Sequence, residues 1–144
     1  MKDTVGKPKL FWHYWPEYSR HLEDREMEEL IEAIRSLQAC YFNKDLTGFD
    51  NVLVGLHDRV WDKYKEHLPS IYLFGARKYA PLSFEDVHAV EYIHALSRHA
   101  AKILYSDEAI DVESGQPHMT HILANIDMFM RCNNNHKIFK QLDK

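Results

Sequence analysis

The sequence is poor in the residues that build tight turns, disulfide frameworks and membrane spans. Its 144 residues include five glycines, five prolines and two cysteines. So few glycines and prolines leave little room for hairpins, which argues against an all-β fold. Cys40 and Cys132 form no CxxC pair, and no charged and then apolar leader opens the chain, so we expect a reducing, cytoplasmic compartment. No run of about 18 apolar residues is present, and no membrane span is expected.

Several familiar catalytic signatures are missing as well. The sequence contains no GxxxxGK[ST], GxGxxG, GxSxG or HExxH string. The dipeptide His57-Asp58 is the pattern of HD-type phosphohydrolases, but a chain with ten histidines is expected to contain such a pair by chance. Eighteen basic against 22 acidic residues give a net charge of −4. This balance argues against a broad nucleic-acid-binding face and leaves room for a small anion pocket.

Apolar residues recur at the three- and four-residue spacing of helices through most of the chain. Leu30, Ile34 and Leu37 show the pattern in the first periodic stretch, and Ile93, Leu96 and Leu104 fall on one stripe of a later one. We therefore predict an all-α fold, a helical bundle of four to five main helices in a single domain over residues 1–144. Helices are expected over about 17–41, 49–67, 83–105 and 117–131, with shorter segments at 71–79 and 136–144.

Two polar stripes run along the last two long predicted helices. One carries Glu91, His94, Arg98 and Lys102 beside the apolar stripe, and the other carries His118, His121 and Asn125 at positions i, i+3 and i+7. The stripes either meet at a site, or the first is solvated while the histidines and asparagine pack with satisfied hydrogen bonds. Periodicity alone favours the second interpretation.

The composite string from Tyr92 to Asn125 favours a site. It reads Y-I-H-A-L-S-R-H-A-A-K and then D-V-E-S-G-Q-P-H-M-T-H-I-L-A-N. The string resembles the core of a family common in bacteriophages and prophages, the dATP/dGTP diphosphohydrolase domain proteins. That family is related in kind to the all-α MazG-like nucleoside triphosphate pyrophosphohydrolases. F-G-A-R-K-Y at 74–79 and the K-P…W-P-E opening at 7–17 also resemble it, and the segment 18–70 between them looks like an insertion.

The resemblance implies metal-dependent hydrolysis of a purine (deoxy)nucleoside triphosphate to the monophosphate and pyrophosphate, with Mg²⁺ or Mn²⁺ as cofactor. If the chain is phage-encoded, this takes place in the cytoplasm of a bacterial host. For phosphate binding the resemblance points to Lys78, Arg98, His99 and Lys102. For a catalytic role it points to His118, His121 and Asn125. Asp111, with Glu91 as a nearby acidic residue, is expected to bind the metal ion.

Other carboxylates remain open as ligands. Glu108-x-x-Asp111 has the form of half the carboxylate signature of MazG-like enzymes, and Glu23 and Glu26 face inward on the first helix, although acidic residues in a first turn also stabilise a helix. Mg²⁺ prefers oxygen ligands, so we expect the histidines to contact substrate or orient Asp111 rather than bind Mg²⁺. Activity is expected to fall as imidazoles protonate below about pH 6.5.

Two other function classes stay open. The chain is alternatively a non-catalytic phage protein that binds a nucleotide or a nucleotide-derived signal. It is otherwise an interaction protein that oligomerises through Tyr41, Trp61 and Tyr64 of the inserted helices. The aromatic content of those helices predicts a homo-oligomer.

Overall fold

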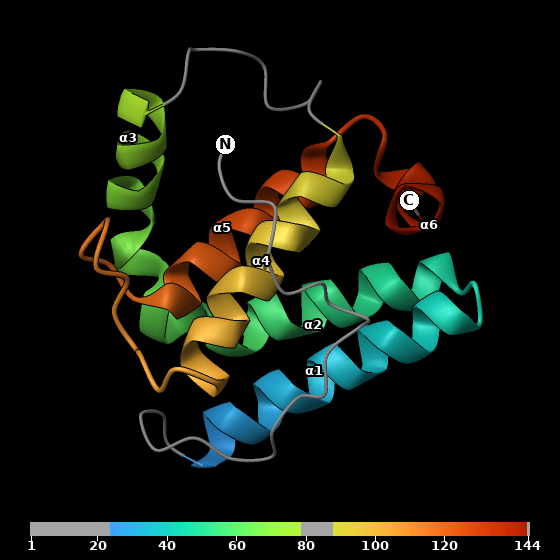
Figure 1. Cartoon of the computed structure of the whole chain (residues 1–144), viewed down its shortest axis with the longest axis horizontal. Helices are drawn as coiled ribbons and strands as arrows, with labels where there is room; N and C mark the ends of the chain where they lie inside the picture. The colour runs from blue at the N-terminus through green and yellow to red at the C-terminus, as the bar shows by residue number, and fades with distance from the viewer. Residues whose placement is uncertain (1–23, 79–87, 144) are drawn as a thin grey trace.

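The computed structural model of the protein describes residues 24–78 and 88–143, and these are all-α (Figure 1). Within these ranges the β-type pairing is limited to one bridge between Ile110 and Pro117. The prediction of an all-α bundle of four to five main helices is confirmed. In chain order the elements are α1 (Asp24–Phe42), α2 (Leu46–Tyr64), η1 (Lys65–His67), α3 (Leu68–Lys78), α4 (Ala89–Leu104), α5 (His118–Arg131), η3 (Asn135–Lys137) and α6 (Ile138–Leu142).

Helix α5 forms the centre of the bundle. It contacts α2, α3 and α4, and ten of its 14 residues are buried. Residues 118–126 are all buried, so this part of α5 is covered by neighbours on every side. In Figure 1, α4 runs alongside α5, and α1 and α2 form a second antiparallel pair below them.

Aromatic side chains join the two helix pairs at the C-terminal end of the chain. The ring of Phe49 on α2 lies 6.1 Å from that of Phe129 on α5 and 5.5 Å from that of Phe139 on α6. Tyr41 on α1 packs edge-on against Phe139 at 5.8 Å. Aromatic pairs at these separations add to the energy of apolar burial, so the short α6 is anchored to the bundle.

Two of the three aromatic residues expected at a partner surface belong to the core instead. Tyr41 and Tyr64 are 6% and 7% exposed, and only Trp61 is substantially exposed, at 38%. The buried rings satisfy their hydroxyl groups inside the protein, Tyr41 by donating to Asp143 and Tyr64 by donating to Glu26. The expectation that all three form an interaction surface is therefore wrong for these two.

Glu26 has a structural role between α1 and α2. Its carboxylate accepts from Tyr64 at 2.8 Å and pairs with Lys63 at 2.5 Å. These contacts tie the start of α1 to the end of α2, which explains why an acidic residue faces inward on α1. Glu23, the other inward candidate, lies outside the described residues, as does the 7–17 opening. The helix expected from residue 83 begins at Ala89 instead, because His88 is extended and caps its start.

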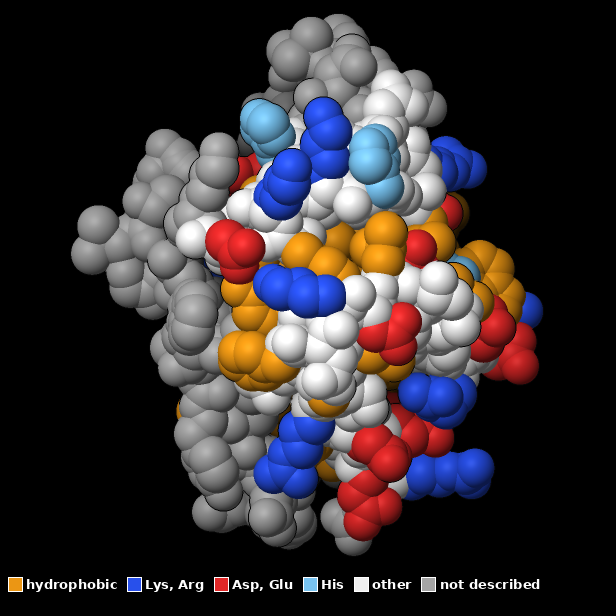
Figure 2. All heavy atoms as spheres, turned by 90° about the vertical axis from the view of Figure 1, so that its right-hand side faces the viewer, with side chains coloured by type: hydrophobic (Ala, Val, Ile, Leu, Met, Phe, Trp, Pro, Cys, Tyr) orange, Lys and Arg blue, Asp and Glu red, His pale blue; other side chains and the backbone are white. Residues whose placement is uncertain are grey.

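The surface on the α6 side has mixed charge. In Figure 2, which shows the right-hand side of Figure 1, basic and histidine side chains gather at the upper end of this face, and acidic and basic groups alternate lower down. The exposed basic residues of the η3–α6 segment are His136, Lys137 and Lys140. No helix in the described ranges has the length and apolar character needed to cross a membrane.

Candidate functional site

Polar side chains from α4, the following loop and the start of α5 meet at one place. We call this group the imidazole–carboxylate cluster; its members are His99, Glu108, Asp111, Ser114, His118 and His121. The backbone brings the loop back across the helix end: the Glu108 N–H donates to the Lys102 carbonyl at 3.0 Å, and the His118 N–H donates to the Ala109 carbonyl at 2.9 Å.

A tight turn orients Asp111. Gly115 has a φ of +75°, in the left-handed region that favours glycine, and its N–H donates to the Asp111 carbonyl at 2.7 Å. The Asp111 Oδ2 atom then accepts from the Ser114 hydroxyl at 2.8 Å and from the Ser114 N–H at 3.1 Å. The sequence D-x-x-S-G thus fixes a carboxylate whose direction is set by the backbone.

His121 supports the same carboxylate from α5. Its Nε2 lies 2.7 Å from Ser114 Oγ and 3.4 Å from Asp111 Oδ2. A carboxylate only accepts hydrogen bonds, so the Ser114 hydroxyl donates to Asp111, and its oxygen accepts from His121 Nε2–H. In a nucleophilic Ser-His-Asp triad the aspartate contacts the opposite imidazole nitrogen. This arrangement therefore positions Asp111 and does not activate Ser114.

His118 connects the other two members of the cluster. Its Nε2 lies 2.6 Å from Glu108 Oε2, and its Nδ1 lies 2.8 Å from His99 Nδ1. His99 in turn stacks on His121, with ring centroids 4.2 Å apart and planes 5° from parallel. The histidine stripe of α5 and one residue of α4 therefore form a continuous imidazole group, flanked by Glu108 on one side and Asp111 on the other.

Burial favours the uncharged form of His99 and His121. It lowers the pKa of His99 to about 2, with additional lowering from the neighbouring His121 and His118. Burial also lowers the pKa of His121, and the attraction of Asp111 only partly opposes this. Both rings therefore protonate at a lower pH than an exposed imidazole, so the predicted loss of activity near pH 6.5 should shift to more acidic conditions.

The pKa of the Asp111 carboxyl group is lowered too, and for a carboxyl group this favours the charged form. Burial raises its pKa, but the two hydrogen bonds from Ser114 and the nearby His121 and His99 lower it by more. The net pKa lies below the usual range for aspartate. Asp111 is therefore an anion at neutral pH and is available to a cation.

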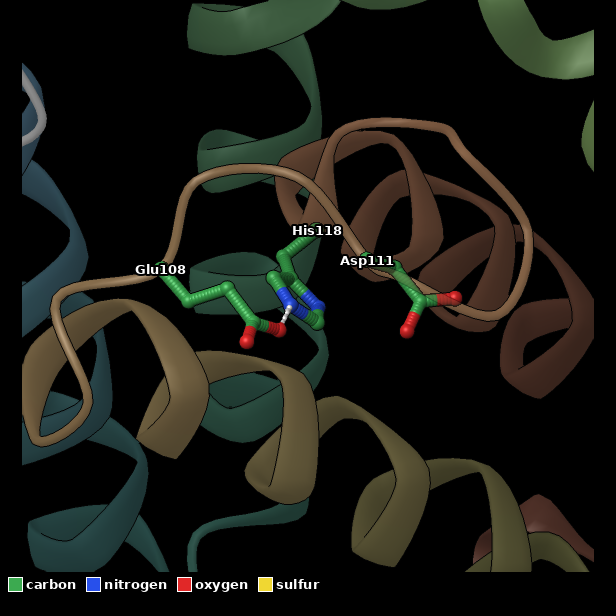
Figure 3. Close-up of side chains that lie close together, drawn as sticks. All are labelled: Glu108, Asp111 and His118. Carbon is green, nitrogen blue, oxygen red and sulfur yellow. Dashed lines mark hydrogen bonds and ion pairs between the residues drawn. The ribbon is translucent and has the colours of Figure 1, made fainter.

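Three residues of the cluster have the spacing of a metal site. Glu108, Asp111 and His118 each offer one ligand atom, and these atoms all lie within 4.8 Å of one another. Figure 3 shows the His118 imidazole between the two carboxyl groups, with Glu108 and Asp111 both projecting from the loop. The side chains of Glu108 and Asp111 are 27% and 16% exposed, so they remain open to solvent.

The structure brings together some of the predicted site residues and separates others. His99, Asp111, His118 and His121 lie in the cluster. Asn125 is buried one turn beyond His121 and donates to the His121 carbonyl at 2.8 Å, which places it behind the cluster.

Glu91 does not lie beside Asp111. It is exposed in the first turn of α4, eight residues from His99, or about 12 Å along the helix. Arg98 and Lys102 lie about 60–100° around α4 from His99, and the Arg98 Nη1 atom is shielded from solvent. Lys102 is exposed and Arg98 is half-buried. Lys78 ends α3, and its side chain lies outside the described part of the chain.

Glu108 was left open as a metal ligand on the E-x-x-D pattern, and Ser114 belongs to the string that resembles the family but had no role assigned to it. The sequence pattern that could have identified both residues is E-x-x-D-x-x-S-G, which is followed after Gln116 by the P-H-M-T-H start of the last long helix. Turn residues, carboxylates and histidines that adjoin in sequence are close in space when a left-handed glycine folds the loop back.

Comparison with known proteins places most of this structure in one family. The family described as dATP/dGTP diphosphohydrolase, N-terminal, matches residues 57–142. The match includes the entire cluster and begins inside the 18–70 segment, whose status as an insertion stays a prediction. No curated protein and no solved structure matches the chain.

Proposed function

Because the chain belongs to the dATP/dGTP diphosphohydrolase N-terminal family, we propose that it hydrolyses a purine (deoxy)nucleoside triphosphate with the help of a divalent metal ion. In this reaction water adds to the α-phosphorus and the bond between the α-phosphorus and the bridging oxygen breaks. Pyrophosphate leaves, the monophosphate remains, and one proton is released. The site must therefore hold phosphate charge, position water and accept a proton.

The observation that carries this proposal is the grouping of Glu108, Asp111 and His118. Their ligand atoms lie within 4.8 Å of one another, and both carboxylates remain partly exposed to solvent. The lowered pKa of Asp111 keeps it in the ionised form that binds cations. Two carboxylates suit Mg²⁺ or Mn²⁺, so the residues present fit the ion that this chemistry requires.

Glu108 and Asp111 have different roles in this proposal. A divalent ion supplies positive charge for the phosphate oxygens and activates water as a nucleophile. Asp111, fixed by Ser114 and His121, provides a rigid anionic ligand. Glu108 is the more exposed of the two, and its Oε2 contacts His118. We assign acceptance of the proton from the attacking water to its Oε1.

We assign phosphate binding to Arg98 and Lys102. They lie one turn apart on α4, and the Lys102 backbone carbonyl already contacts the loop through Glu108. Charge-assisted bonds from Arg and Lys to phosphate are strong polar contacts. The buried, neutral His99 lacks the positive charge for this task, so we assign it to the cluster instead.

The experiment is a panel of nucleoside triphosphates incubated with Mg²⁺, with Mn²⁺ or with a chelator, and read by chromatography of the products. We expect dATP or dGTP to yield the monophosphate and pyrophosphate in equal amounts, and the chelator to abolish the reaction. Release of inorganic phosphate in place of pyrophosphate would contradict the proposed bond cleavage. Tight binding of a purine nucleotide without turnover would instead support the non-catalytic alternative.

A further inference from the structure

The contact between His99 and His118 joins two equivalent ring atoms, Nδ1 to Nδ1, at 2.8 Å. A hydrogen bond between imidazole nitrogens needs a proton on one and a lone pair on the other. The position of that proton fixes the tautomer of each neutral ring. His99 therefore controls which nitrogen of His118 presents a lone pair.

The opposite nitrogen of His118 faces the carboxylates. Nε2 lies 2.6 Å from Glu108 Oε2, and it donates to that carboxylate when it carries a proton. A nitrogen that binds a metal ion must present its lone pair. The His118 proton then resides on Nδ1, and because His118 is only 1% exposed, its acceptor there is His99 and not water.

The position of His99 is itself fixed. Its ring stacks on that of His121 at 4.2 Å and 5°, and His121 is held by Ser114. A partner that orients a metal-binding histidine is a general requirement of such sites. Here that partner is the imidazole of His99. Its Nδ1 can donate a hydrogen bond to His118 Nδ1 when no metal ion is bound and accept one from it when an ion is bound, without either ring moving.

We propose that His118 binds the divalent ion through Nε2 beside Glu108 and Asp111, and that His99 is the positioning residue that fixes His118 in this tautomer. The inference rests on the proposed function, since it concerns the same ion. One imidazole and two carboxylates favour Mn²⁺ over Mg²⁺, because Mg²⁺ prefers oxygen ligands alone.

Calorimetric titration of the chelator-treated full chain with Mn²⁺ and with Mg²⁺ tests this assignment. We expect tighter binding of Mn²⁺. His99→Leu removes the acceptor and should weaken Mn²⁺ binding about 10- to 100-fold, the range for partners of metal ligands. His99→Asn keeps an acceptor oxygen near the Nδ1 position and should retain most of the affinity. His136→Leu, which removes an exposed histidine from η3, should bind Mn²⁺ like the wild type.

A spectroscopic measurement separates direct coordination from a structural effect. Electron spin-echo spectra of the Mn²⁺-loaded wild type and of His99→Asn should show coupling to an imidazole nitrogen, and His118→Gln should lack it. Absence of nitrogen coupling in the wild type, or equal Mn²⁺ affinity in the wild type and in folded His99→Leu, would overturn the assignment.

Pyrophosphate release from dGTP, measured on the same preparations, distinguishes this inference from the proposed function. Mn²⁺ binding with nitrogen coupling but without pyrophosphate release overturns the proposed function and supports the ligand assignment. Pyrophosphate release by a Mn²⁺-loaded protein whose spectrum lacks nitrogen coupling supports the proposed function and overturns the assignment of His118 as a ligand.

Discussion

Burial and hydrogen bonding set the charge of His99 and Asp111 in the imidazole–carboxylate cluster. Burial, together with the neighbouring rings of His121 and His118, lowers the pKa of His99 to about 2. Asp111 is partly buried too, yet the hydrogen bonds from Ser114 keep its pKa below the usual range. The cluster thus combines neutral nitrogens with an ionised carboxylate, a combination suited to binding a cation.

The low pKa of His99 predicts that the metal-free protein loses stability in mild acid. The unfolded chain binds a proton at His99 below about pH 6.5, whereas the folded chain does not until about pH 2, so the free energy of unfolding decreases as the pH falls below 6.5. From pH 7 to pH 5 this one group accounts for a loss of about 2 kcal/mol.

Urea denaturation at both pH values measures this effect in the presence of a chelator. His99→Gln should lose about 2 kcal/mol less than the wild type over the same interval. Above about pH 4.5, Asp111 remains ionised in both states and does not contribute. Equal losses in the two proteins would show that His99 titrates normally.

His121 offers a second test at this scale. His121→Gln disturbs the contact that positions Asp111 through Ser114, and we expect about a 10- to 100-fold loss of metal affinity or activity. The requirement for a divalent ion should remain, because Glu108 and Asp111 are unchanged. Steady-state rates measured against metal concentration check this. Unchanged rates and affinity in a folded variant would remove His121 from the site.

Helix α4 carries two different surfaces at the scale of elements. His99 faces α5 and the cluster, while Lys102 is exposed and Arg98 is half-buried on another side of the helix. The sequence predicted the helix and the spacing of these residues. It did not show which face meets α5, because a helical wheel gives relative directions and no neighbours.

The assignment of Arg98 to phosphate binding leads to a prediction about nucleotide affinity. Arg98→Ala should weaken binding of a purine deoxynucleoside triphosphate by about 1.5–3 kcal/mol, the usual worth of a charge-assisted bond. Arg35→Ala, on the exposed side of α1, serves as the control and should bind like the wild type. Calorimetry with folded variants gives both values. Equal affinity of Arg98→Ala and wild type would place the phosphate site elsewhere.

The helices themselves were largely predictable. Burial of every third or fourth residue places α2, α3 and α5 within a few residues of the expected ranges. The predicted metal pair of Glu91 and Asp111 had less support, because it relied on proximity in sequence. The loop between α4 and α5 returns across the C-terminal end of α4 and places Glu108 beside Asp111. Glu91 lies in the first turn, at the other end of the helix.

Self-association stays a prediction at the scale of the whole molecule. It is based on the aromatic residues of the inserted helices, of which Phe42 and Trp61 are exposed, at 62% and 38%. Light scattering across a range of concentrations should give a mass of at least twice 17.1 kDa. A monomeric mass at the highest concentration would contradict this expectation.

The central claim is that Glu108 and Asp111 form the metal-dependent centre of a nucleotide pyrophosphohydrolase. The most direct measurement is pyrophosphate release from dGTP and dATP, with Mn²⁺ or Mg²⁺, by the wild type, Glu108→Gln and Asp111→Asn. Glu32→Gln, an exposed carboxylate of α1, is the matched control. We predict release by the wild type and the control, and loss of at least about 100-fold in both cluster variants. Full activity in folded Glu108→Gln and Asp111→Asn, or no release by the wild type with either ion, would contradict the claim.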